Sequence, residues 1–137
     1  MQVLGGVAVL GRRRAPDGPL ALASLADEGL PYGALTSTAK RLALSERETA
    51  ESVGIPARTL ARRRNKRFPR DESERLLNLA RVIARALVVF GDPNKARDWL
   101  MSPSRALGRV PFSLVGSAFG VEALLAELVR IEHGVFA

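Results

Sequence analysis

The chain has 137 residues, of which 47% are hydrophobic, and its 21 basic and 14 acidic side chains give a formal net charge of +7. This length and apolar content suffice for one domain or two small helical modules, and they argue against a wholly disordered chain. The absence of cysteine and the single histidine, His133, exclude disulfide frameworks and cysteine or histidine metal clusters, so no cofactor or metal is expected.

Nothing in the sequence indicates a membrane or secreted protein. The longest apolar stretch, residues 79–90, is too short to cross a bilayer and contains Arg81 and Arg85. The N-terminal apolar block precedes its basic run, which is the reverse of a secretory signal. We therefore expect a cytoplasmic protein without a membrane partner.

Helix signals fill the first half of the chain. Pro19 suits a helix start and residues 29–31 a stop, and a second helix is expected around residues 33–43. Ser45 and Glu48 form a capping box, which predicts a helix opening near residue 46 and ending at Gly54. Pro56 then suits the first turn of the following helix.

The longest predicted helix runs over residues 72–90. Its polar residues recur at spacings of four, three and four and form one narrow stripe, made of Glu74, Asn78, Arg81 and Arg85. The remaining surface is apolar, Val88 included, so this helix should be buried on most sides, and Gly91 is placed to cap it.

The rest of the chain predicts smaller helical elements. A short helix is expected around residues 93–100, turns near 102–108 and 110–116, and a final helix over about 121–133. Trp99 is expected to be a core residue buried against the 72–90 helix. Strand-like alternation is absent after residue 11, so the predicted fold class is all-α.

The marks of a helix-turn-helix are Ala50, Val53, Gly54, Ile55 and Leu60. Ala50 supplies the small residue needed where two helices cross closely, and Gly54 supplies a backbone that can adopt positive φ in the turn. Ile55 and Leu60 then hold the second helix against the rest. Against the pattern, Arg63 stands where such motifs usually place an apolar residue, and Ile55 cannot cap the second helix with a side-chain oxygen.

The whole net charge lies on the second helix and its exit. Residues 58–70 contain seven basic and no acidic residues, which leaves 14 basic against 14 acidic residues elsewhere. Arg58 and Arg62 lie four apart, where they can make bidentate contacts to guanine in a major groove, and the later cations suit phosphates. Clustered basic residues are often only a solvated face, but this charge and motif together favour DNA binding. The predicted DNA-binding residues are Arg58, Thr59, Arg62, Arg63, Arg64, Lys66, Arg67 and Arg70.

The C-terminal half carries a recurring set of apolar, glycine and proline residues, which are Phe90, Gly91, Ala96, Trp99, Leu100, Pro103, Ala106, Leu107, Gly108, Pro111, Leu114, Gly120 and the closing "RIEHGVFA". In these residues it resembles the Xre/MbcA/ParS-like toxin-binding domain of Xre-type antitoxins from RES–Xre toxin–antitoxin modules. With the upstream helix-turn-helix, the resemblance covers roughly residues 32–137. The sequence departs from the family where Ser117 replaces a usual threonine and Ala118-Phe119 replace a polar, often acidic pair.

The resemblance implies an antitoxin that neutralises a RES-domain, NAD-degrading toxin by obstructing its active site, and that represses its own operon. The implied partners are the RES-domain toxin and operator DNA. A homodimer within a toxin–antitoxin hetero-oligomer is expected, because helix-turn-helix readers usually bind two half-sites. The implied toxin-binding residues are Glu132, His133, Gly134, Val135, Phe136 and Ala137.

These inferences divide the chain into three parts. Residues 1–31 form an N-terminal segment that could be a dimerisation arm or a disordered terminus. Residues 32–70 form the helix-turn-helix DNA-binding region, and residues 71–137 form the helical toxin-binding domain.

Two other classes of protein compete with an antitoxin. A DNA-binding transcriptional regulator without a toxin partner would explain the basic segment but would leave "RIEHGVFA" unexplained. An enzyme is not expected, because the sole histidine lies near the end, the carboxylates are scattered and no glycine-rich phosphate loop follows a strand.

Overall fold

A computed structural model describes residues 18–134, and that range holds seven α-helices, one short 3₁₀ helix and no β-strand. The predicted all-α fold class is confirmed. None of the helices in the described range is long and apolar enough to cross a membrane. The elements are α2 (Pro19–Glu28), α3 (Tyr32–Arg41), α4 (Glu46–Ser52), α5 (Ala57–Arg62), α6 (Arg70–Phe90), α7 (Pro93–Met101), η1 (Pro111–Leu114) and α8 (Ala118–Glu132).

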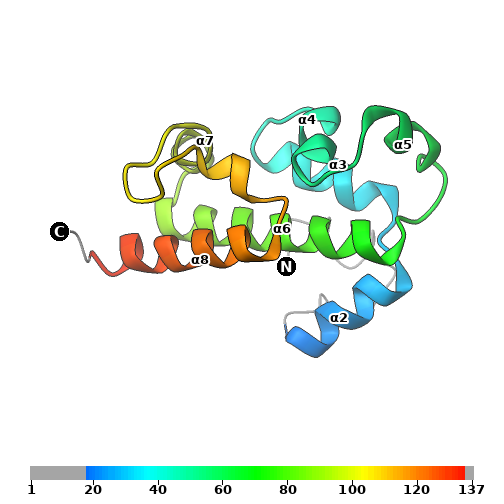
Figure 1. Ribbon diagram of the computed structural model, residues 1–137, viewed down its shortest axis with the longest axis horizontal. Coiled ribbons are helices and arrows are strands. Elements are labelled where there is room, and N and C mark those ends of the chain that lie inside the picture. The colour runs from blue at the N-terminus through cyan, green and yellow to red at the C-terminus, as the bar shows by residue number, and fades with distance from the viewer. Residues whose placement is uncertain (1–17, 135–137) are drawn as a thin grey trace.

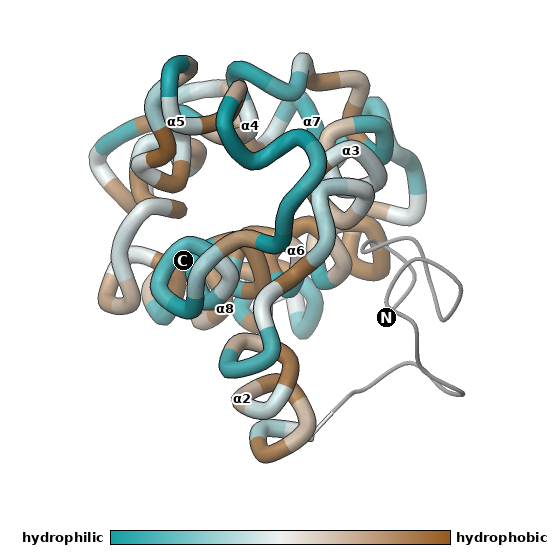
Figure 2. Tube along the Cα trace, turned by 90° about the vertical axis from the view of Figure 1, so that its right-hand side faces the viewer, coloured by the Kyte–Doolittle hydropathy of each residue, from teal (hydrophilic) through white to brown (hydrophobic). Residues whose placement is uncertain are grey.

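Helix α6 is the axis of the molecule (Figure 1). Helix α8 lies alongside its C-terminal part, α2 packs on its N-terminal part, and α3, α4, α5 and α7 lie on the side away from α2. Figure 2 shows hydrophobic residues concentrated where α6 passes through the middle of the molecule, and hydrophilic runs on the outer loops. The predicted burial of α6 on most sides is confirmed by its buried residues, which are Ser73, Leu76, Leu77, Leu79, Ala80, Val82, Ile83 and Ala86.

Two hydrophobic residues are less buried than the sequence predicts. Val88 is 65% exposed, because it lies three and seven residues after Arg85 and Arg81 and therefore shares the polar face of α6. Trp99 is only half-buried, since α7 lays its ring against Phe90, itself half-buried near the end of α6, with ring centroids 5.9 Å apart. Trp99 packs against the 72–90 helix as predicted, but the expectation that it is buried there is wrong.

The predicted capping box and the Gly91 cap are confirmed, while α4 ends at Ser52, two residues before Gly54, and Pro56 precedes α5 as its N-cap. The Glu48 amide donates to Ser45 Oγ at 2.9 Å, and the Ser45 amide donates to the Glu48 carboxylate at 3.0 Å. Gly91 ends α6 in the left-handed region with φ +70°. The last helix begins three residues earlier than predicted, because Ser117 Oγ accepts the Gly120 amide and caps it.

Residues 18–31 belong to the folded unit. Helix α2 packs on α6 through the buried residues Leu25 and Ala26, and Leu30 is fully buried. The Leu30 amide donates to Ser73 Oγ at 2.9 Å, and the Leu30 carbonyl accepts the Phe68 amide at 2.8 Å. The predicted N-terminal segment is therefore a packed helix and turn from residue 18 onward, while residues 1–17 lie outside the described residues.

The first turn of α4 is tied to α3 by Glu46, and this contact predicts a pH dependence of stability. Thr36 and Tyr32 donate hydrogen bonds of 2.7 and 2.8 Å to the carboxylate, and these bonds hold the pKa of Glu46 below its ordinary value. Because the pKa is lower in the folded than in the unfolded chain, ionised Glu46 stabilises the fold above its unfolded pKa. That contribution is lost as the pH falls through the folded pKa.

We therefore expect Glu46→Gln to be clearly destabilising at pH 7 and nearly neutral relative to the native chain well below about pH 4. Urea unfolding at a series of pH values measures the difference. Glu122→Gln, an exposed change of equal charge on α8, is the control. An equal loss of stability from Glu46→Gln at every pH would mean that the carboxylate charge is unimportant.

Candidate DNA-binding and toxin-binding surfaces

The predicted helix-turn-helix consists of α4, a turn over residues 53–56, and α5. Ala50 is fully buried and its carbonyl accepts the Ile55 amide at 2.9 Å, which closes the turn. Gly54 adopts φ +78°, as predicted for the turn. Leu60 anchors the inner face of α5 in the core. The opposite face of α5 is therefore turned outward.

That outward face carries part of the predicted basic set. Arg58 and Arg62 are exposed on α5, and Arg62 Nη2 lies 3.4 Å from Thr59 Oγ1. Arg64 and Lys66 are exposed on the chain that leaves the helix. The side chains of Arg58 and Lys66 form no hydrogen bond or ion pair with any residue that the structure describes. These side chains can reach a ligand without breaking a contact within the fold.

The other three predicted cations hold partners within the fold. Arg63 binds Glu72 through two bonds of 3.0 and 3.1 Å, which raise the pKa of Arg63. Arg67 donates to the Gly29 carbonyl at 2.7 Å. Arg70, at the first position of α6, lies 2.8 Å from the Asp27 carboxylate and near two further carboxylates, those of Asp71 and Glu74.

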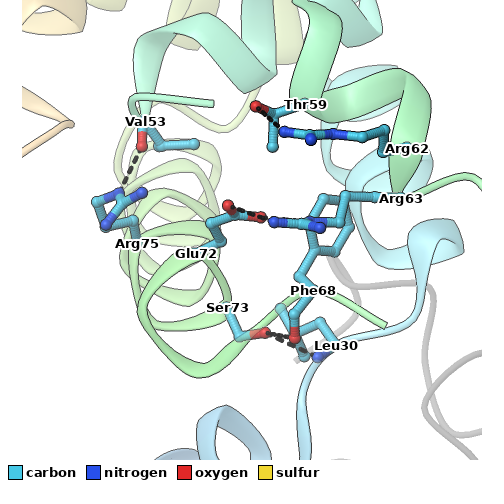
Figure 3. Close-up of polar contacts among 9 residues, drawn as sticks. All are labelled: Leu30, Val53, Thr59, Arg62, Arg63, Phe68, Glu72, Ser73 and Arg75. Carbon is cyan, nitrogen blue, oxygen red and sulfur yellow. Dashed lines mark hydrogen bonds and ion pairs between the residues drawn. The ribbon is translucent and has the colours of Figure 1, made fainter. Parts of the chain in front are cut away.

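Two candidate functional residues on α6, Glu72 and Arg75, could not be identified from the sequence. Figure 3 shows Glu72 meeting Arg63 from α6, and Arg75, one turn further along, donating to the Val53 carbonyl at 2.6 Å. Both appear in the sequence as ordinary polar positions of an amphipathic helix. Their partners lie nine and 22 residues away, beyond the range of the spacing rules for a single helix.

The described part of the predicted toxin-binding residues lies at the end of α8, opposite α5 in the molecule (Figure 1). The Glu132 carboxylate pairs with the Arg85 guanidinium of α6. His133 is exposed and caps α8, and Gly134 follows with φ +67°, as expected for a left-handed cap. Residues 135–137, also predicted to bind the toxin, lie outside the described residues.

The C-terminal half also exposes apolar side chains at both ends of α8 and beside it. Phe119 is 85% exposed at the start of α8, and Val129 is 43% exposed further along it. Val88 and Leu125 line a shallow hollow between α6 and α8, with Arg81 and Arg85 at its edge. Exposed apolar groups rimmed by charge are typical of protein interaction surfaces.

Both halves of the chain match known protein families. Residues 21–81 match the antitoxin Xre-like helix-turn-helix domain, and residues 85–134 match the antitoxin Xre/MbcA/ParS C-terminal toxin-binding domain. A protein named antitoxin Xre from Photorhabdus laumondii is 31% identical over 118 residues, which cover 83% of this chain and 80% of that protein. The chain belongs to the Xre antitoxin family.

Two further relatives carry the name antitoxin Xre. The protein from Yersinia enterocolitica is 40% identical over 94 residues, covering 66% of this chain and 64% of that protein. The protein from Pseudomonas putida is 36% identical over 83 residues, covering 58% of this chain and 52% of that protein. The chain thus spans between about half and four-fifths of the length of these relatives.

Membership of the Xre antitoxin family confirms the resemblance seen in the sequence. The helix-turn-helix match begins within α2 and ends within α6, and the toxin-binding match begins four residues later in the same helix. Helix α6 therefore contributes to both matched regions, in agreement with its contacts to α2 on one part and α8 on another.

Proposed function

We propose that this protein is an antitoxin that neutralises a RES-domain, NAD-degrading toxin and represses its own operon, without enzymatic activity of its own. The observation that carries the proposal is the union of two matched regions in one chain, an Xre-like helix-turn-helix and an Xre/MbcA/ParS toxin-binding domain. The names of the three relatives support the antitoxin role. Partners of this kind would place the protein in the cytoplasm. We further propose that it acts as a homodimer within a toxin–antitoxin hetero-oligomer.

In the proposed DNA complex, the outward face of α5 enters the major groove. Arg58, Thr59 and Arg62 are candidates for base contacts, because they lie on that face and are not held by the core. Arg64 and Lys66 are candidates for phosphate contacts from the exit of the helix. Arg67 and Arg70 already have partners within the fold, so we assign them a weaker, long-range attraction for the phosphates.

Substitutions at Arg62 and Lys66 test this division of roles. Arg62→Ala is expected to cost about 1–3 kcal/mol on the operator and to relax sequence preference, because it removes a base contact. Lys66→Ala should weaken binding to operator and unrelated duplexes alike and reduce the salt slope by about one phosphate contact. Fluorescence anisotropy on both duplexes across a salt series measures these effects. Equal losses of sequence preference from the two changes would contradict the division.

For the toxin, we propose that the C-terminal end is the inhibitory element. The proposed residues begin at the end of α8 with Glu132, His133 and Gly134 and continue with Val135, Phe136 and Ala137. In the family that the sequence resembles, the antitoxin's end obstructs the NAD pocket. The aromatic ring of Phe136 has the chemistry to stack within a site for a dinucleotide.

Deleting residues 135–137 is expected to separate toxin binding from neutralisation. Residues beyond the Gly134 cap should add little to the core, so the truncated chain should fold and bind operator DNA nearly as the full chain does. It should bind the RES-domain toxin through its helical surface but protect NAD poorly at saturating concentration. NAD consumption by the toxin is the measurement. Full protection of NAD by the truncated chain would show that residues 135–137 are not the inhibitory element.

The alternative function is a transcriptional regulator without a toxin partner. It accounts for the helix-turn-helix but not for the C-terminal match. Co-expression with the RES-domain protein of a neighbouring gene distinguishes the two, because only an antitoxin would co-purify with it and relieve its toxicity.

A further inference from the structure

The ion pair between Arg63 and Glu72 is unlike the other ion pairs among the residues that the structure describes. Its two side chains are 23% and 15% exposed, and it is the only pair within residues 18–134 in which both fall below one quarter. Both guanidinium–carboxylate bonds are formed, at 3.0 and 3.1 Å. A planar, two-bonded pair of this kind fixes orientation as well as distance.

The helix that this pair holds is too short to fix its own direction. Helix α5 has six residues, and no side chain caps its N-terminus. An isolated helix of fewer than two turns is unstable in water, so the direction of α5 depends on tertiary contacts. Leu60 supplies the apolar contact on its inner face, and Arg63, the residue that caps its C-terminus, supplies the polar one.

A second contact from α6 holds the other end of the motif. Arg75 Nε donates to the Val53 carbonyl at 2.6 Å, where α4 ends, and a Cβ placed on Gly54 would lie 3.7 Å from the same nitrogen. Helix α6 therefore contacts the chain on both sides of α5, as Figure 3 shows. Arg75 binds the turn before α5, and Glu72 binds Arg63, the residue after it. The two α6 residues that make these contacts lie about one helical turn apart.

We propose that Glu72 is a positioning residue for DNA recognition, which locks Arg63 onto α6 so that α5 presents Arg58 and Arg62 at a fixed angle. Arg63 then acts within the protein and does not contact phosphate, a revision of the role that its place in the basic run suggests. This inference rests on the proposed DNA-binding function.

The two roles for Arg63 predict opposite effects of neutralising Glu72. If Glu72 merely withholds a DNA-binding cation, Glu72→Gln frees Arg63, tightens binding to all DNA and steepens the salt dependence by about one contact. If Glu72 positions α5, the same substitution weakens operator binding and leaves binding to unrelated DNA and its salt slope nearly unchanged.

The experiment compares the full chain with three variants on operator and unrelated duplexes, by anisotropy across a salt series. For Glu72→Gln we expect a loss of about tenfold in the operator-to-unrelated affinity ratio. Glu74→Gln is the matched control, because it makes the same change of charge two residues away at a side chain that is 56% exposed. It should keep the ratio of the native chain. The ratio is insensitive to a smaller folded fraction, which lowers both affinities equally.

The exchange Arg63→Glu with Glu72→Arg is the third variant and guards against misfolding of the single change. It restores an ion pair while removing the cation from position 63, so it should recover most of the lost ratio if the pair positions α5. A ratio for Glu72→Gln equal to or above that of the native chain, or no recovery in the exchange variant, overturns the inference. Failure of the native chain to prefer its operator would instead overturn the DNA-binding function on which the inference rests.

Discussion

Gly120→Ala is expected to destabilise the protein by about 3 kcal/mol or more, although alanine is the better helix former. A Cβ at this buried position in the first turn of α8 would lie 2.0 Å from the Leu114 carbonyl oxygen and 2.9 Å from its carbon. Backbone atoms of η1 cannot swing away as a flexible side chain could. The substitution must therefore push η1 and α8 apart, in the half of the molecule that matches the toxin-binding domain.

Chemical denaturation of the full chain measures this effect. Ala126→Gly, at an exposed position of the same helix, is the matched control and should cost about 1 kcal/mol through helix propensity alone. If Gly120→Ala proved neutral or stabilising, η1 would have to move aside at little cost, and the close contact would not matter for the fold.

Phe68→Ala is expected to cost about 3–5 kcal/mol, the loss typical of a well-packed core aromatic. Phe68 is 1% exposed and stacks on Tyr32 with ring centroids 5.9 Å apart. Its amide binds the Leu30 carbonyl, and its carbonyl accepts the Ser73 hydroxyl at 3.0 Å (Figure 3). One residue thus joins the exit of the basic segment to the turn before α3 and to the first turns of α6.

Two further substitutions show whether the loss of stability comes from the lost apolar volume or from the buried position of Phe68. Phe68→Leu should lose less than about 1.5 kcal/mol, because it keeps most of the apolar volume. Trp99→Ala should cost less than Phe68→Ala despite the larger ring, since Trp99 is half-buried and meets α6 through Phe90. If Trp99→Ala lowered the free energy of unfolding more than Phe68→Ala, the aromatic contacts of α7 would matter more for stability than those of Phe68.

The turn of the helix-turn-helix and the capping box could be predicted from the sequence because their causes are local. The Ser45–Glu48 capping box and the positive φ at Gly54 involve neighbours within four residues, so the residue types alone determine them. The concentration of net charge in residues 58–70 is likewise a property of the sequence. The family was indicated by a resemblance of the C-terminal half to a known toxin-binding domain, and the matched domains confirm it.

The tertiary structure decided which of those charges remain available. Arg62 and Arg63 are adjacent and chemically identical, yet one faces outward on α5 and the other is bound by Glu72. Successive residues on a helix point about 100° apart, so the direction from which α6 approaches determines the fate of each. Sequence therefore determined the helices, the turn and the total charge. Contacts between residues far apart in the chain determined which side chains the protein presents to a partner.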